Sequence, residues 1–235
     1  MDGFINYAHR GASSYAPENT FSAFYLGLQM GANGIETDVH ATLDGVLVLF
    51  HDDTLDRVTN ACGPVSALSY EELRQVEILG NGKTPDRIVT LEEFLKFFGF
   101  RQLALAIELK QEGVAAQTVA LINRYGARDK VTVTSFSVQA LKELRECDSK
   151  IRAGLLTSRE DEETFALLRE LSLQEYCPKA TLVTPEKVAA WKSAGYGVRA
   201  WGVSDEALML KVLQSGVDGM TVNFPDLLTN ALEQR

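Results

Sequence analysis

The sequence predicts an α/β fold, a (β/α)8 TIM barrel with a small insertion after the third strand. Short β-rich runs alternate with helical patterns along the 235 residues, which is typical of a parallel sheet covered by helices. Eight such runs fit a barrel near the lower end of its size range, and polar residues follow several of them, where barrel enzymes build their active sites. A doubly wound open sheet is the alternative. No G-x-G-x-x-G follows the first run, which weakens its dinucleotide-binding version.

The expected strands are short and rich in branched or aromatic side chains: 4–8, 34–39, 46–50, 103–107, 131–135, 152–156, 198–202 and 218–222. Helix signals lie between most of them. Phe21, Phe24, Tyr25 and Leu28 share one helix face. The segment 90–93 has the form of a capping box, and Thr184-Pro185 offers an N-cap followed by proline at the first helical position.

The region after the second strand is irregular. Residues 39–46 leave no room for a helix, and Asp44-Gly45 is a strong turn signal. The run 46–50 therefore either returns as an antiparallel hairpin or follows an extended crossing and runs parallel. Residues 53–89 have weak periodicity and many turn residues. We expect them to form a small excursion from a single domain that spans 1–235.

Composition limits the classes of partner. Lys plus Arg number 23 against 32 for Asp plus Glu, a formal charge of -9, which argues against nucleic-acid binding. The three cysteines are widely spaced and predict free thiols in a reducing compartment. No apolar run reaches the ~18–20 residues of a membrane span, and the first residues carry an acid where a secretory leader needs a base. We expect a cytoplasmic protein without stable membrane association, as a monomer or a homodimer.

Three acidic residues stand near the ends of predicted strands. Glu36 and Asp38 are two apart, so their side chains share one face of the strand, and Glu108 ends another strand. Hard oxygen ligands without cysteine favour one divalent cation, Mg²⁺ or Ca²⁺, over Zn²⁺. The alternative is a structural ion network with Arg10 and Lys110.

Two histidines also follow predicted strands. His9 and His51 are suited to divide acid and base work, because the ordinary imidazole pKa lies near neutrality. We expect His40, just beyond Asp38, to face the opposite side of its strand, toward a helix or solvent.

Arg10 and Lys110 supply local positive charge. An arginine fork fits two phosphate oxygens and a lysine adds a point charge, so beside a divalent cation they form a clamp for a phosphoryl group. Trp201 adds an aromatic side chain at the end of 198–202.

These residues belong to a longer series of motifs that resembles the glycerophosphodiester phosphodiesterase family. The resemblance runs in order along nearly the whole chain, and the spacing of the two histidine motifs around E-x-D is specific. The motifs are HRGASSYAPENT (9–20), IETDVHATLDG (35–45), LFHDDTLDR (49–57), TLEEFL (90–95), IELK (107–110), TSFS (134–137), WGV (201–203) and GVDGMTVNFPD (216–226).

The resemblance implies a barrel of the phosphatidylinositol phospholipase C-like kind, with a small insertion that matches 53–89. Members hydrolyse glycerophosphodiesters such as glycerophosphocholine or glycerophosphoethanolamine to glycerol 3-phosphate and an alcohol. Carried over by position, His9 and His51 become the acid/base pair. The expected metal ligands are Glu36, Asp38 and Glu108, and the expected substrate contacts are Arg10, Lys110 and Trp201.

One position departs from the family pattern. The family usually ends its last strand with T-D-x-P, and here Asn223 stands in place of the aspartate. We expect this change to alter substrate detail without touching a candidate catalytic group.

Several alternatives stay open at this point. One is a lysophospholipase D-type activity, and another is a non-catalytic barrel that binds phosphodiesters, which would be expected to have lost a histidine or a metal ligand. A metal-dependent amidohydrolase would need H-x-H at the first strand, which is absent.

Overall fold

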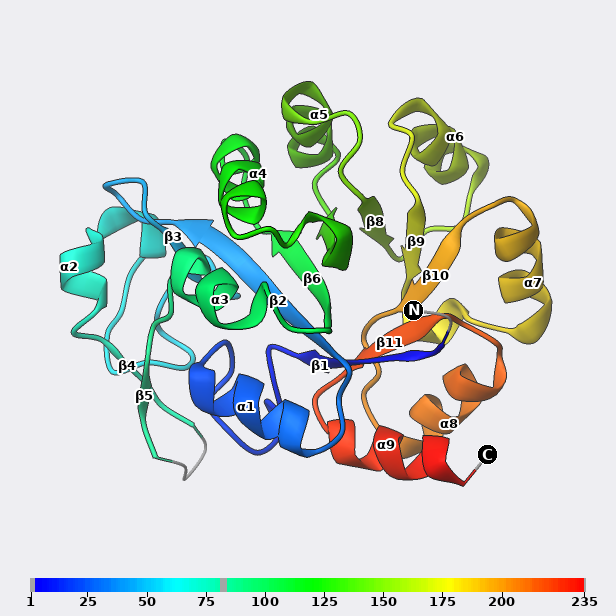
Figure 1. The fold of residues 1–235 in the computed structure, drawn as a ribbon, viewed down its shortest axis with the longest axis horizontal. Helices are drawn as coiled ribbons and strands as arrows, with labels where there is room; N and C mark the ends of the chain where they lie inside the picture. Colours follow the sequence, from blue (N-terminus) through cyan, green and yellow to red (C-terminus); the bar gives the residue numbers. More distant parts are fainter. Residues whose placement is uncertain (1–2, 81–83, 235) are drawn as a thin grey trace.

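Eight parallel strands close into a barrel in the computed structural model, which describes residues 3–80 and 84–234 (Figure 1). The strand β1 pairs with both β2 and β11, and this closes the sheet on itself. The fold class is therefore confirmed. The barrel strands are β1 (Ile5–His9), β2 (Gly34–Ala41), β6 (Ala104–Leu109), β7 (Val131–Ser135), β8 (Ala153–Thr157), β9 (Glu175–Pro178), β10 (Gly197–Ala200) and β11 (Gly219–Val222).

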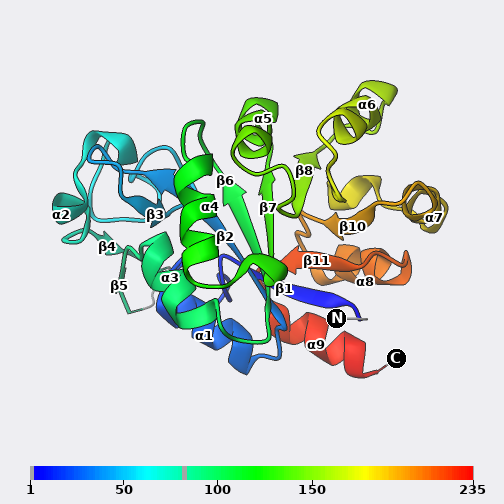
Figure 2. The same cartoon turned by 45° about the horizontal axis from the view of Figure 1, so that its top comes forward.

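One helix on the outside follows each barrel strand, directly or after an insertion (Figures 1 and 2). The expected caps are present: Thr90 forms a capping box with Glu93, and Thr184 caps a helix that begins with Pro185. The helices are α1 (Phe21–Gln29), α3 (Leu91–Phe98), α4 (Ala115–Arg124), α5 (Val138–Cys147), α6 (Glu162–Glu170), α7 (Pro185–Ser193), α8 (Glu206–Gln214) and α9 (Pro225–Glu233). Short 3-10 turns span Arg128–Lys130 and Ala180–Leu182.

The prediction was wrong about one barrel strand and missed another. The run 46–50 contains β3 (Leu47–Leu49), which pairs antiparallel with β2 and lies outside the closed ring, so the hairpin alternative is correct. The place in the ring is taken by β9, whose sequence EYCP has neither alternation nor a β-branched residue. A strand buried along all four residues can form from such a sequence because its neighbours supply the pairing.

The insertion after β3 has a small apolar core of its own. Val48, Phe50, Leu55, Val65 and Ile78 are all buried there, apart from the main core between the barrel and its helices. The segment contains a 3-10 turn (Val65–Ala67), α2 (Tyr70–Leu73) and the short hairpin strands β4 (Glu77–Ile78) and β5 (Asp86–Arg87). Residues 81–83 of the expected insertion 53–89 lie outside the described residues.

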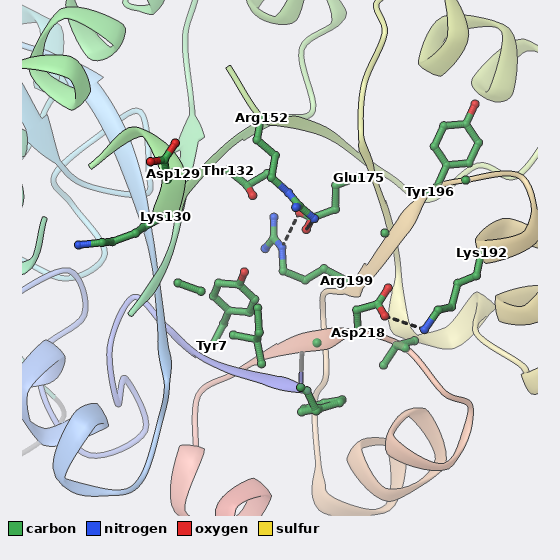
Figure 3. A pocket seen from close by; sticks show the side chains of 18 residues that line it. Tyr7, Asp129, Lys130, Thr132, Arg152, Glu175, Lys192, Tyr196, Arg199 and Asp218 are labelled. Carbon is green, nitrogen blue, oxygen red and sulfur yellow. Dashed lines mark hydrogen bonds and ion pairs between the residues drawn. The ribbon is translucent and has the colours of Figure 1, made fainter. Parts of the chain in front are cut away.

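The N-terminal end of the barrel interior is polar and partly hollow. A cavity of about 800 Å³ opens there, and Arg199 crosses it to place Nε 3.1 Å from Oε2 of Glu175 (Figure 3). The Arg199 guanidinium also lies over the ring of Tyr7. The side chains of Arg199 and Glu175 are 2% and 7% exposed, so the pair is desolvated. This ion pair stands where barrels usually pack apolar layers.

We predict that Glu175→Leu lowers the free energy of unfolding by about 3–5 kcal/mol, because it leaves the buried Arg199 charge without its partner. Urea unfolding measures the change. The double variant Glu175→Leu/Arg199→Met, which removes both charges, is expected to recover most of the loss. Equal losses in the single and double variants would contradict this account.

Candidate active site

Three carboxylates meet at the C-terminal end of the barrel. In the parallel register, Asp38 of β2 lies beside Glu108 of β6, and Glu36 lies beside His9 of β1. Because successive strand side chains alternate, Glu36 and Asp38 both face the interior. One ligand oxygen from each of the three carboxylates lies within 4.8 Å of the others, and all three residues are buried.

Burial and mutual repulsion set the protonation of this cluster. Burial, with Asp38 and Glu108 close by, raises the pKa of Glu36 well above its usual range. The same effects, burial first and then Asp38, raise the pKa of Glu108 to about 7. Burial would also raise the pKa of Asp38, but Arg10 and Lys110 outweigh it and hold that pKa below its ordinary value. Burial and mutual repulsion therefore disfavour the ionised forms of these acids unless a positive charge lies close by.

Two cationic side chains contact the carboxylates from either side. Lys110 Nζ donates to Oε1 of Glu108 at 2.8 Å and lies 3.8 Å from Oδ1 of Asp38. Arg10 Nε lies 3.2 Å from Oδ2 of Asp38. Arg10 has a left-handed φ of 55° and is followed by Gly11 at φ 82°. A Cβ on Gly11 would lie 2.4 Å from the backbone carbon of Ala23, so this turn requires glycine.

The carboxylate oxygens fit a divalent cation. Ca²⁺ binds oxygen at about 2.3–2.6 Å, so two oxygens on opposite sides of one ion are about 5 Å apart, close to the spread of this cluster. Oδ1 of Asp38 is buried and has no hydrogen-bond partner among the described residues. An orphaned buried oxygen of this kind is expected where an absent ion is the missing partner.

His9 is held by the residue that departs from the expected pattern. Its Nδ1 lies 2.6 Å from Oδ1 of Asn223, at the end of β11. An amide oxygen only accepts, so Nδ1 carries the proton and Nε2, which lies 3.8 Å from Glu36, keeps a lone pair. The expectation that position 223 touches no candidate catalytic group is therefore wrong. Burial lowers the pKa of His9 to about 4, and the adjacent Arg10 adds to this effect.

His51 is held by the residue that follows it. Its Nδ1 lies 2.6 Å from Oδ1 of Asp52, so Nδ1 again carries the proton in the neutral ring. Burial lowers the pKa of His51, although Asp38 and Asp52 favour its charged form.

The expectation for His40 is wrong. His40 is two residues beyond Asp38, so alternation puts both side chains on the same side of the strand. It is buried, with Nε2 3.3 Å from the carbonyl oxygen of His51 and Nδ1 3.1 Å from Oε1 of Gln111.

Sequence reasoning missed three polar residues around the site. Asn19 donates to Oδ2 of Asp38 at 2.9 Å and accepts from Thr37 at 2.7 Å, which fixes the carboxylate. Glu18 accepts from Arg10 at 3.0 Å and is also bound by Arg57. Glu18 and Asn19 belong to the motif PENT, and Arg57 belongs to LDR. Their place in motifs of the family series is the sequence feature that could have identified them.

An aromatic pair borders the same mouth. Trp201, which follows β10, meets Phe136 edge-on with ring centroids 4.8 Å apart, and its indole N–H donates to the Thr157 carbonyl. A hollow of about 520 Å³ on this side is lined by residues that include His51, Asp52 and Lys110. The larger cavity lies at the opposite end of the barrel, away from the carboxylates. Because two of the candidate residues, His51 and Lys110, line the smaller hollow, we place the site at this end of the barrel.

Comparison with known proteins agrees with this geometry. The model of the glycerophosphoryl diester phosphodiesterase family matches residues 9–227. The chain belongs to this family.

Named relatives in the family resemble the chain over nearly its full length. Glycerophosphodiester phosphodiesterases from Caldanaerobacter subterraneus subsp. tengcongensis and Bacillus altitudinis are 30% and 32% identical, covering 97% of this chain in both cases and 97% and 98% of their own. A phosphodiesterase from Oleispira antarctica, solved with the product sn-glycerol-3-phosphate, has a TM-score of 0.86 at 29% identity, over 97% of this chain and 96% of that one. Membership of the glycerophosphoryl diester phosphodiesterase family makes the chain a phosphoric diester hydrolase. Within the described ranges, no helix is both long and apolar enough to cross a membrane.

We predict that Ca²⁺ or Mg²⁺ raises the melting temperature of the metal-free enzyme, and raises it more at pH 8 than at pH 6. Glu108 must lose its proton to bind a cation. Below the Glu108 pKa of about 7, the affinity for the cation therefore falls roughly tenfold per pH unit for each proton that must be released. Thermal unfolding at fixed ionic strength measures the shift. Glu108→Gln should abolish it, and Glu170→Gln, at an exposed position, should leave it unchanged. A shift equal at both pH values would contradict the assignment.

We predict that Asn223→Asp raises the pKa of His9 by roughly one unit or more, because a carboxylate at 2.6 Å stabilises the imidazolium ion and an amide does not. NMR titration of the imidazole resonances measures this, with His9→Gln used to assign the signal. Asn223→Leu, which removes the acceptor altogether, is the control and should not raise the pKa. An unchanged His9 in Asn223→Asp would show that the contact has no electrostatic role.

Proposed function

We propose that this enzyme hydrolyses glycerophosphodiesters such as glycerophosphocholine or glycerophosphoethanolamine to glycerol 3-phosphate and an alcohol, with one divalent cation, Mg²⁺ or Ca²⁺. The observation that carries the proposal is the carboxylate triad together with two imidazoles whose Nδ1 atoms are held by other side chains, His9 at the end of β1 and His51 in the loop after β3. In the Oleispira relative, the named product is sn-glycerol-3-phosphate, which supports the glycerophosphoryl class.

Arg10 and Lys110 bind the phosphate in this proposal. Both are more than four-fifths buried and already face the carboxylates, so their charges act in a poorly solvated site. Glu36, Asp38 and Glu108 hold the cation, which when bound neutralises charge that develops on the phosphoryl oxygens.

His9 is the general base and His51 the general acid. Because the pKa of His9 is about 4, its Nε2 is unprotonated at neutral pH and ready to take the proton of the nucleophile. Burial lowers the pKa of His51, but Asp38 and the hydrogen-bonded Asp52 carboxylate favour its imidazolium form, which carries a proton on Nε2 as well as on Nδ1. His51 delivers the Nε2 proton to the alkoxide oxygen as the bond from phosphorus to that oxygen breaks.

The nucleophile is water or the glycerol 2-hydroxyl, which stands next to the ester. Proximity favours the internal hydroxyl, which would form a cyclic phosphate that a second step opens with water. Trapping the cyclic intermediate, or following ¹⁸O from water through a single turnover, distinguishes the two routes.

The Trp201 and Phe136 pair supplies an apolar wall for the glycerol carbons, and the amino or choline headgroup extends beyond it.

Lysophospholipase D-type activity is the alternative, since lysophospholipids contain the same glycerophosphoryl core. A non-catalytic role is disfavoured because both histidines and all three acids are present. A substrate panel coupled to glycerol 3-phosphate release tests the substrate class, and turnover confined to lysophospholipids would overturn the main proposal. A reducing, cytoplasmic setting remains a prediction from the cysteine pattern.

We predict that His9→Ala and His51→Ala each lower kcat by about 10²–10⁴-fold, which is the usual contribution of general acid–base catalysis. Steady-state kinetics measures the loss, with circular dichroism to check the fold. Near-normal turnover in either variant would remove that histidine from the mechanism.

Chelation of divalent cations should abolish turnover, and Mg²⁺ or Ca²⁺ should restore it. Turnover that is indifferent to chelation would remove the cation from the mechanism.

A further inference from the structure

We propose that Arg57, in the insertion, is a positioning residue for His51. Its guanidinium holds Asp52 and Glu18 at the same time, and so fixes the loop that carries His51 against the loop that carries Arg10. The inference rests on the proposed function, because it uses the role of His51 as general acid.

The guanidinium is bound on both edges. Toward Asp52, Nε donates to Oδ2 at 2.5 Å and Nη2 donates to Oδ1 at 3.1 Å. Toward Glu18, Nη1 donates to Oε2 at 3.1 Å and Nη2 donates to Oε1 at 2.7 Å. Two bidentate contacts on one planar group define the separation and the relative orientation of the two carboxylates, which the point charge of a lysine cannot do.

The contacts continue from both carboxylates into the site. Oδ1 of Asp52, which Arg57 binds, also binds His51 Nδ1 at 2.6 Å. Oε1 of Glu18, the other oxygen that Nη2 binds, accepts from Arg10 Nη1 at 3.0 Å. One chain of polar contacts therefore runs from the imidazole of His51 through Arg57 to the proposed phosphate ligand. The insertion and the β1–α1 loop, 39 residues apart at Arg57 and Glu18, are joined by it.

The Arg57 bridge contributes more to the position of the His51 loop than to the stability of the fold. The Arg57 side chain is 48% exposed, and ion pairs at such exposure contribute about 0–1 kcal/mol. The surrounding backbone is held without Arg57, because Leu55 N donates to the Gly63 carbonyl and Val65 N donates to the Asp53 carbonyl. The apolar core of the insertion also remains when Arg57 is changed. Catalysis, in contrast, is sensitive to displacements of about 1 Å, which cost up to roughly 100-fold in rate.

The test compares three arginine variants on a natural diester. Arg57→Ala should lower kcat about 10–100-fold with little change in KM, because the general acid is displaced while Arg10 and Lys110 still bind phosphate. Arg57→Lys should fall between Arg57→Ala and the wild type. Arg74→Ala is the matched control, since Arg74 lies in the same insertion, is 54% exposed and pairs with Glu71 at 3.1 Å. Its kinetics should match the wild type.

A second substrate separates positioning of the acid from a general loosening of the site. A 4-nitrophenyl ester of glycerol phosphate releases a phenolate that needs no proton, so the loss in Arg57→Ala should shrink several-fold or more on this substrate. His51→Ala should show the same shrinkage. Equal losses on both substrates, a change in KM alone, or wild-type kinetics in Arg57→Ala would overturn the inference.

The outcome for His51 keeps this inference distinct from the proposed function. If His51→Ala is impaired and Arg57→Ala is not, the positioning role fails and the proposed mechanism stands. If His51→Ala itself is unimpaired, the proposed mechanism fails. Thermal unfolding of each variant, expected within a few degrees of the wild type, verifies that the comparison is between folded proteins.

Discussion

The repulsion among three buried carboxylates is the constraint on which the rest of the site depends. Glu36, Asp38 and Glu108 cannot move apart, because the parallel register of β2 and β6 fixes their backbones. The surrounding residues limit the cost of this arrangement. Arg10 and Lys110 bring positive charge to the cluster, and Asn19 donates to Asp38. A buried oxygen of Asp38 still has no hydrogen-bond partner among the described residues, and a divalent cation would supply one.

The same constraint explains why the two imidazoles have different partners. His9 lies beside Glu36 and Arg10, and its Nδ1 is held by a neutral amide, so burial keeps the ring uncharged. His51 has the Asp52 carboxylate as its partner, and Arg57 holds that carboxylate in turn. The two histidines thus differ in their Nδ1 partner, which is a neutral amide for His9 and a carboxylate for His51. Such a difference is how a pair of histidines can perform opposite proton transfers at one pH.

Much of the site was predictable because strand geometry is local and periodic. Residues at the C-terminal ends of parallel strands must meet at one mouth, so His9, Glu36, Asp38 and Glu108 could be brought together from the sequence. The strand β9 was missed because EYCP lacks the usual strand pattern, and its strand state depends on neighbours on both sides. The same approach counted 46–50 as a barrel strand, although an antiparallel hairpin was one of the two arrangements considered for it, and this is the arrangement that the structure has.

Contacts between loops could not be predicted from the periodicity of the sequence. Arg57 and Glu18 come from segments with no periodicity, and nothing in their spacing indicates that they meet. The contact between Asn223 and His9 joins the two ends of the barrel sequence and depends on closure of β11 on β1. The sequence was enough to select the groups to which we assign the chemistry, whereas the structure was needed to find the side chains that contact and orient them.

The most direct test of the central claim is a crystal structure of the enzyme with Mn²⁺, using anomalous scattering to locate the ion. The account predicts one anomalous peak bounded by carboxylate oxygens of Glu36, Asp38 and Glu108, at ligand distances of about 2.0–2.4 Å. A fully occupied ion elsewhere, with the three carboxylates still paired to Arg10 and Lys110, would contradict it.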